Sequence, residues 1–259
     1  MKKTQFLELN SNILKDKVVL DLACHDGEST KIILKNGAKQ IYAVDIRHDL
    51  IQHAKKNVNG NVDFFVGDIT DLNLIGPLVT NSETVTCFGV FYHLFDHFRF
   101  LSYILKPHIQ HVLIETLFGT ETANPEMFWG FEATDSIFNG YAQDCSIIPH
   151  GTPNLSWIIN SAKIFGFECD WVHCYGVQTT VDRTCLSYEE YLTIRGESWP
   201  AYNDIISETT VIPDFVTDEI NQMLQVHLPE HRRMILRLYN SKLVNSVPLD
   251  INDIYKWPY

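Results

Sequence analysis

The chain has 259 residues, 45% of them hydrophobic, and a formal net charge of −12. This length suits one large domain with a modest extension, and the hydrophobic content excludes a disordered chain. Nucleic-acid surfaces need clusters of Lys and Arg. The 20 basic residues here are dispersed, which disfavours nucleic acid as a partner.

The first residues and the cysteines indicate a compartment. Residues 1–3 resemble the basic start of a secretory signal, but Gln5, Glu8 and Asn10 interrupt any apolar segment behind it. Elsewhere no apolar run reaches the ~18 residues of a membrane span, so no membrane partner is expected. The six cysteines show no compact scaffold spacing, so we expect reduced thiols. These features predict a cytoplasmic protein.

Residues 17–27 predict the first strand, turn and helix of a doubly wound α/β domain. An apolar run leads into Asp21, a turn ends at Gly27, and a helix is expected over residues 28–35. Ligands of such domains bind beyond the carboxyl ends of the strands. The next apolar run ends in Asp45, near the ~20-residue spacing at which a carboxylate binds ribose hydroxyls. Together the two carboxylates indicate a nucleoside-containing cofactor, although a buried strand with an incidental acidic end has the same pattern.

The turn between this strand and helix distinguishes two kinds of cofactor. A dinucleotide site needs Gly-x-Gly-x-x-Gly, so that the backbone can approach a pyrophosphate at the helix N-terminus. Here Ala23 and His25 stand where glycines are expected, and Asp26 would repel a pyrophosphate. S-adenosylmethionine has no phosphate and needs less bare backbone. The turn therefore favours S-adenosylmethionine.

Three further strands are expected in chain order, within residues 61–69, 84–94 and 111–116. The first ends in Gly-Asp-Ile, and the second runs into a polar aromatic turn that contains Tyr92 and His93. Near-continuous apolar strands that alternate with helical stretches indicate a parallel sheet covered on both faces.

These pieces, in this order, resemble class I S-adenosylmethionine-dependent methyltransferases, whose first motif is an apolar strand followed by Asp-x-Gly-x-Gly-x-Gly. The resemblance implies a Rossmann-like α/β fold with a doubly wound, seven-stranded, mostly parallel sheet. It is nearest to the branch containing the tRNA wobble-uridine carboxymethyltransferases, through residues 89–94, 141–149 and the Trp-containing helix at 154–167. That branch holds a carboxylated cofactor with basic residues that we do not identify here, so carboxy-S-adenosylmethionine is the less favoured cofactor.

The resemblance also implies which residues contact S-adenosylmethionine. They follow four strands of the sheet: Asp21, Ala23, Cys24, His25 and Gly27; Asp45 and Ile46; Asp68 and Ile69; and Gly89, Val90 and Phe91. The first group is expected at the methionine end, the second at the ribose and the third at the adenine. The fourth lines the side that faces the transferable methyl.

The chemistry of methyl transfer limits what the catalytic residues must do. The reaction is an in-line displacement with a neutral thioether as leaving group, so the protein contributes mainly alignment and exclusion of water. A base is needed only for a poorly ionised hydroxyl or a protonated amine. His93 is the candidate base, because imidazole titrates near neutral pH, and Tyr92 would orient the acceptor. A buried His93 that braces the turn is the alternative.

Residues 117–153 form a long insertion rich in aromatic side chains. Long ordered loops are usually functional. We therefore expect a lid whose Trp129, Phe131, Tyr141 and His150 point toward a planar or apolar small-molecule substrate. A hydrophobic cluster that closes the sheet edge is the alternative.

The last strands of the sheet are expected after a helix at 154–165, which Gly166 ends. Residues 167–175 and 177–186 would form the final antiparallel pair, with Gly176 at the turn.

From residue 187 the periodicity is helical. It predicts helices at 188–195, 217–228 and 229–244, with apolar stripes that need a surface to pack on. We therefore expect a cofactor-binding domain over residues 1–186 and a helical C-terminal extension over residues 187–259. The extension would dock on the domain, cap the site or form a homodimer.

A metal site is not expected. His93 and His97 have the i, i+4 spacing of helical ligands, but no third ligand is evident. The sequence thus predicts methyl transfer from S-adenosylmethionine to a small molecule. The alternatives are carboxymethyl transfer to tRNA, cleavage of the cofactor without an acceptor, and a non-catalytic module that binds the cofactor and regulates a partner.

Overall fold

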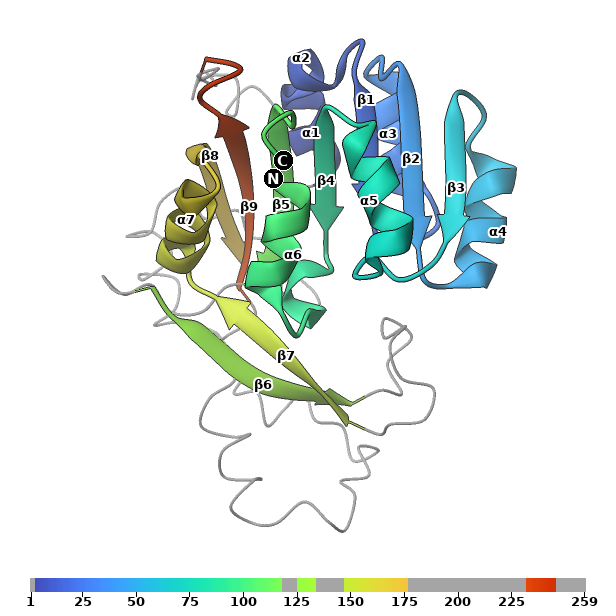
Figure 1. Cartoon of the computed structure of the whole chain (residues 1–259). Helices are drawn as coiled ribbons and strands as arrows, with labels where there is room; N and C mark the ends of the chain where they lie inside the picture. Colours follow the sequence, from blue (N-terminus) through green and yellow to red (C-terminus); the bar gives the residue numbers. More distant parts are fainter. Residues whose placement is uncertain (1–2, 118–124, 134–146, 177–231, 246–259) are drawn as a thin grey trace.

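The computed structural model describes residues 3–117, 125–133, 147–176 and 232–245, which contain a seven-stranded sheet with helices on both faces (Figure 1). The strands in sheet order are β3 (Val62–Val66), β2 (Gln40–Asp45), β1 (Val18–Leu22), β4 (Thr84–Phe88), β5 (His111–Leu117), β9 (Arg232–Asn240) and β8 (Phe167–Gly176). The strands from β3 to β5 are parallel, and β9 is antiparallel to both of its neighbours. The expected doubly wound, mostly parallel sheet is confirmed.

Two apolar cores lie on opposite faces of this sheet. One face is covered by α1 (Lys3–Leu9), α2 (Ser11–Leu14), α3 (Glu28–Lys35) and α4 (His48–Asn57). The other is covered by α5 (Leu72–Thr80), α6 (His97–Ile104) and α7 (Leu155–Ile164). β4 is buried along its whole length, as expected of a central parallel strand with helices on both sides.

Side chains at the helix starts explain where several helices begin. Asp71, Asp96 and Asn154 each accept a hydrogen bond from a backbone N–H in the first turn of α5, α6 and α7. Such caps satisfy backbone donors that have no partner within the helix. In α3, Glu28 in the first turn and Lys35 in the last complement the helix dipole. No helix in the described part of the chain has the length and apolar character needed to cross a membrane.

The end of the chain differs from the sequence-based expectation. Residues 232–240 form β9 instead of part of a helix, and β9 pairs with both β5 and β8. Within the described residues, the antiparallel partner of β8 is therefore β9. Residues 234–240 are all buried. A strand buried on both faces lacks polar–apolar alternation, so its periodicity does not distinguish it from a helix.

This correction bears on the expected C-terminal extension. Because β9 completes the sheet, residues 232–240 belong to the same domain as the other strands and cannot supply a helix to a dimer interface. The expected strand at 177–186 and helices at 188–195 and 217–228 lie outside the described residues.

A buried ionic network holds β9 in place. The fully buried Arg237 donates from Nε and Nη2 to the two carboxylate oxygens of Asp170, at 2.8 and 3.0 Å, and from Nη1 to Asn10 Oδ1 at 2.8 Å. Asp170 is the extra residue where the β8–β9 register shifts between Cys169 and Trp171. A bulge of this kind redirects a side chain. The network joins β8, β9 and the end of α1.

Candidate cofactor site

The turn between β1 and α3 adopts a glycine-like backbone at residues that are not all glycine. Ala23, His25 and Gly27 have φ values of 57°, 56° and 85°, in the left-handed region that favours glycine. At Gly27 there is no space for a side chain either, because a Cβ would lie 2.9 Å from Val58 Cγ2 and 3.0 Å from Ala54 Cβ on α4. The turn therefore has the shape that the resemblance implies, although two of its three glycines are replaced.

Asp21 fixes the base of this turn. Its side chain is buried and accepts hydrogen bonds from Thr30 Oγ1 at 2.6 Å, from Thr86 Oγ1 at 2.7 Å and from Ser29 Oγ at 3.4 Å. Burial raises the pKa of the Asp21 carboxyl, and the hydrogen bonds from Thr30 and Thr86 oppose this shift. The carboxylate thus ties β1 to α3 and β4. Its direct contact with the methionine end stays a prediction.

Asp45, at the end of β2, lies directly against the turn. Its Oδ2 accepts the backbone N–H of His25 at 2.9 Å, and its Oδ1 accepts the backbone N–H of Arg47 at 3.0 Å. The Arg47 guanidinium adds two bonds to the same carboxylate, from Nε at 3.0 Å and from Nη2 at 3.2 Å. The sequence pointed to Asp45 but not to Arg47, because nothing in the spacing predicts that the arginine folds back by two residues.

The ends of β3 and β4 complete the same edge of the sheet. Asp68 Oδ1 accepts from the backbone N–H and the hydroxyl of Thr70, at 2.7 and 2.8 Å, and Ile69 beside it is buried. The backbone N–H of Gly67 donates to the Asp45 carbonyl at 3.0 Å, which joins the ends of β3 and β2. After β4, Gly89 has φ of 73° and donates to the Glu115 carbonyl on β5 at 3.0 Å. The carboxylates expected to face ribose and adenine therefore meet at one edge.

Residues 19–107 match a family model described as a methyltransferase domain. No curated protein matches the sequence. The fold is similar to an S-adenosylmethionine-dependent methyltransferase from Mesorhizobium loti, with 12% identity, a TM-score of 0.54 and coverage of 91% of this chain and 97% of that one.

A second similar structure is the N-terminal domain of EvdMO1, solved in the presence of S-adenosylhomocysteine and D-fucose. It has 13% identity, a TM-score of 0.51 and coverage of 69% of this chain and 78% of that one. At these identities the likeness establishes the Rossmann-like methyltransferase fold. The nearer likeness to the tRNA wobble-uridine branch stays a prediction.

The residues expected at the reacting centre lie on the short helix η1 (Phe91–His93). Tyr92 and His93 are both buried, and their rings lie 4.1 Å apart between centroids at an interplanar angle of 41°. Phe91 has no exposed surface and packs against the rings of His97 and Phe100 at 5.0 and 6.1 Å. The structure thus places Phe91 in the core below the site, while Val90 beside it is partly exposed.

The insertion after β5 contains a hairpin of β6 (Met127–Ala133) and β7 (Ile147–Pro153), seen below the sheet in Figure 1. Its β7 strand contacts η1. Within the hairpin, Phe131 pairs with Pro149, and His150 pairs with Gly130. Tyr141 lies outside the described residues. The expected segment near the reacting centre is therefore present, while its role as a lid stays a prediction.

Trp129 and Gly151 show how the hairpin meets the domain. The half-exposed Trp129 packs edge-on against His97, with 5.9 Å between ring centroids. Across the strand pair, Gly151 leaves space for the same imidazole, because a Cβ there would lie 2.5 Å from His97 Cε1. His97 is also edge-on to Trp157 at 6.0 Å. An aromatic enclosure around His97 therefore joins the hairpin to α6 and α7.

A metal site and a nucleophilic Cys24 have no support in the described residues. His93 and His97 lie on two separate helices, η1 and α6, so their spacing is not that of ligands on one helix. Within the described ranges no group of three His, Cys, Asp or Glu side chains could hold a metal ion. Burial raises the pKa of the Cys24 thiol well above its ordinary value, which keeps it protonated and not nucleophilic.

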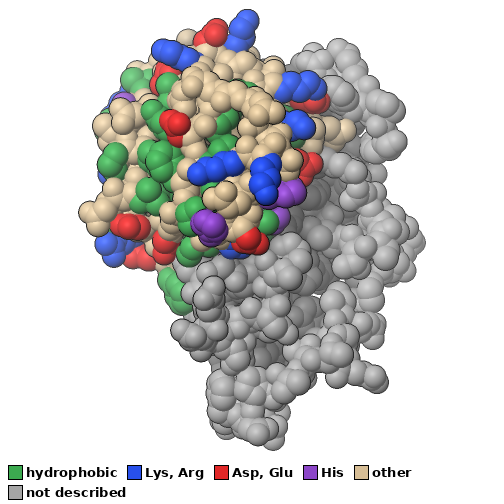
Figure 2. Space-filling model, turned by 90° about the vertical axis from the view of Figure 1, so that its right-hand side faces the viewer, with side chains coloured by type: hydrophobic (Ala, Val, Ile, Leu, Met, Phe, Trp, Pro, Cys, Tyr) green, Lys and Arg blue, Asp and Glu red, His purple; other side chains and the backbone are tan. Residues whose placement is uncertain are grey.

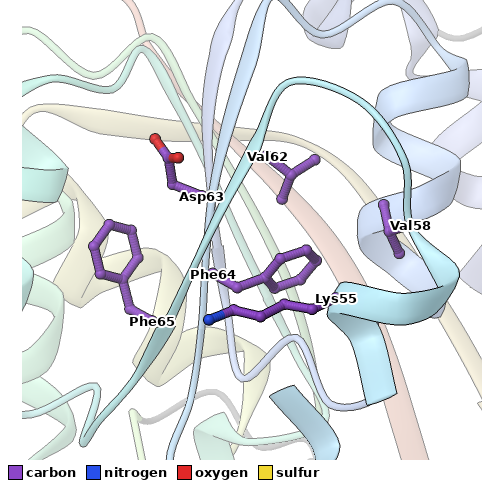
Figure 3. Close-up of a pocket in the computed structure, with 6 residues that line it drawn as sticks. All are labelled: Lys55, Val58, Val62, Asp63, Phe64 and Phe65. Carbon is purple, nitrogen blue, oxygen red and sulfur yellow. The ribbon is translucent and has the colours of Figure 1, made fainter. Parts of the chain in front are cut away.

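A cavity of about 580 Å³ lies away from this site, at the β3 edge of the sheet (Figure 3). In Figure 3, Lys55 and Phe64 lie on one side of β3, and Asp63 and Phe65 on the other. Its remaining lining residues are Val58 and Val62. The cavity includes none of the residues expected to hold the cofactor.

Proposed function

We propose that this chain transfers a methyl group from S-adenosylmethionine to a small-molecule acceptor. The observation that carries the proposal is the turn after β1, whose left-handed residues bring a backbone N–H onto the carboxylate at the end of β2. At this edge, the Asp45 carboxylate could accept ribose hydroxyls once they displace the Arg47 guanidinium, and Asp68 could accept an adenine amino group. These residues fit a nucleoside cofactor without phosphate.

The residues of the domain contribute mainly geometry to the reaction. The cofactor supplies an activated methyl group on a sulfonium. Tyr92 and His93 lie on η1, after the end of β4, where they would orient the acceptor. His93 would remove a proton from the acceptor if its reacting atom is a hydroxyl or an ammonium. The β6–β7 hairpin, which contacts η1, would exclude water.

Charge supports a small-molecule acceptor rather than a nucleic acid. The chain has 32 acidic and 20 basic residues. On the face shown in Figure 2, acidic and basic side chains of the described residues are interspersed. Phosphate binding depends on concentrated positive charge, so this surface favours the small-molecule acceptor over tRNA.

Calorimetric titration of the purified chain with S-adenosylmethionine and S-adenosylhomocysteine tests the cofactor site. We expect micromolar binding of both, which Asp45→Ala abolishes because the ribose loses its acceptor. Asp63→Ala is the matched control, because this carboxylate lies on the adjacent strand and hydrogen-bonds Gln40. If neither ligand binds the unaltered chain, the methyltransferase proposal is wrong.

A second candidate function follows from the same turn. Ala23 and His25 hold backbone conformations that are costly for residues with a Cβ, and Arg47 already occupies the Asp45 carboxylate. Both observations suit a module that binds the cofactor without turnover and regulates a partner. Cofactor binding without methyl transfer to any acceptor in a broad screen would favour this function over the enzyme.

A further inference from the structure

The carboxylate of Asp45 has no acceptor position left for a ligand. A carboxylate offers about four lone-pair positions. Here four N–H groups occupy them, at 2.9–3.2 Å: the backbone N–H groups of His25 and Arg47, and Nε and Nη2 of the Arg47 guanidinium. The Asp45 side chain is 2% exposed and that of Arg47 is 21% exposed. The carboxylate is therefore reached from solvent past the guanidinium.

These four donors differ in their freedom to move. The His25 N–H belongs to the turn after β1, and the Arg47 N–H to the turn after β2, so the backbone fixes both. The guanidinium is carried on a side chain with rotatable bonds and is partly exposed. A ribose that donates its two hydroxyls to Asp45 can therefore replace the guanidinium, but not the backbone donors.

We infer that Arg47 sets the affinity of this site for nucleoside cofactors, because its guanidinium occupies the two acceptor positions that the ribose hydroxyls need. The inference rests on the proposed function, since it takes Asp45 as the ribose acceptor. On binding, the bidentate ion pair between Arg47 and Asp45 is exchanged for two hydrogen bonds from neutral ribose hydroxyls. Bidentate pairs of Arg with a carboxylate are among the strong hydrogen-bonding arrangements in proteins. The apparent dissociation constant equals the intrinsic one divided by the fraction of molecules in which the guanidinium has left Asp45.

This exchange predicts the effect of removing the guanidinium. Arg47→Ala leaves the two backbone donors and opens the other two acceptor positions, so S-adenosylhomocysteine should bind about fivefold to tenfold more tightly. Arg47→Lys should give an intermediate affinity, because an ammonium lacks the planar fork that contacts both carboxylate oxygens. The gain should be the same for 5′-methylthioadenosine, which keeps the ribose hydroxyls but lacks the amino-acid end. It should be absent for 2′,3′-dideoxyadenosine.

The experiment is calorimetric titration of these three ligands into the unaltered chain and the Arg47→Ala, Arg47→Lys and Lys17→Ala variants. Lys17→Ala is the matched control. It removes an ion pair with Glu83 at 3.0 Å at the opposite end of β1, so it should leave all affinities unchanged. In thermal denaturation, Arg47→Ala should melt below the unaltered chain without ligand, and S-adenosylhomocysteine should raise its melting temperature by the larger amount.

The outcomes separate this inference from the proposed function. Tighter binding of both hydroxyl-bearing ligands by Arg47→Ala supports the inference. If the unaltered chain binds S-adenosylhomocysteine and Arg47→Ala binds it equally or more weakly, the inference is overturned while the cofactor site stands. If no variant binds, the proposed function fails and the inference with it. Should Arg47→Ala not fold, Arg47→Lys carries the same comparison.

Discussion

The buried pair between Arg237 and Asp170 offers a sharp test of how β9 is held in the sheet. Asp170→Asn keeps the shape of the side chain but leaves the guanidinium of Arg237, which has no exposed surface, without its counter-charge. Breaking a buried pair by altering one partner typically costs about 3–5 kcal/mol. For a domain of this size, 1 kcal/mol shifts the melting temperature by roughly 2–4 °C. We therefore expect Asp170→Asn to melt roughly 6–20 °C below the unaltered chain.

Removing both partners separates the charge effect from the loss of contacts. The double variant Asp170→Ala, Arg237→Leu leaves no buried charge, so it should recover most of the loss in unfolding free energy. Lys17→Ala provides the comparison with a partly exposed pair, which should cost about 0–1 kcal/mol. Urea denaturation followed by circular dichroism measures each free energy. The reasoning is refuted if Asp170→Asn lies within about 1 kcal/mol of the unaltered chain, or if the double variant is the least stable of the three.

Three further predictions concern the turn, the start of β5 and the hairpin. Ala23→Gly should raise the unfolding free energy by about 0.5–1 kcal/mol in urea denaturation, because relief of the left-handed strain at φ 57° exceeds the added entropy of the unfolded chain. A lower unfolding free energy would contradict the strain. For His111, burial and then the charge of Arg237 lower the pKa to about 4 in the folded chain. The contribution of neutral His111 to the free energy of unfolding is therefore complete above the unfolded pKa of ~6.5 and is lost as pH falls toward 4. Between pH 6.5 and 5, the urea midpoint of the unaltered chain should fall more steeply than that of His111→Asn. Gly151→Ala should displace the hairpin from α6, because its Cβ would lie 2.5 Å from His97 Cε1. The unfolding free energy in urea should fall by about 1–3 kcal/mol, and the tryptophan emission should shift. An unchanged free energy and emission would refute the close packing.

Local sequence patterns were sufficient to predict the first five strands and the carboxylates at the ends of three of them. Each of these strands is a short apolar run that ends in a turn. Three of the four parallel pairs, β1–β2, β2–β3 and β4–β5, join strands that follow one another in the chain. The acids at the strand ends, Asp21, Asp45 and Asp68, could be assigned to one edge because parallel strands end on the same side of a sheet.

The conformation of the turn was only partly predictable. The sequence shows that Ala23 and His25 replace glycines, which left the backbone geometry open. The structure keeps both residues in the left-handed region. Packing of Ala54 and Val58 against Gly27, together with the His25 N–H bond to Asp45, holds the turn in this shape. These contacts come from segments that are distant in sequence, so no local pattern contains them.

The amino-acid sequence by itself determined the parallel half of the sheet and the carboxylates at its edge, because both depend on hydrophobic runs and on the residues that directly follow them. Only the tertiary structure decided that residues 232–240 are a strand, that Arg237 pairs with Asp170, and that Arg47 covers Asp45. A strand buried between two others has no periodicity of its own to distinguish it. Likewise, the partner of a long charged side chain depends on which surfaces the fold brings within its reach.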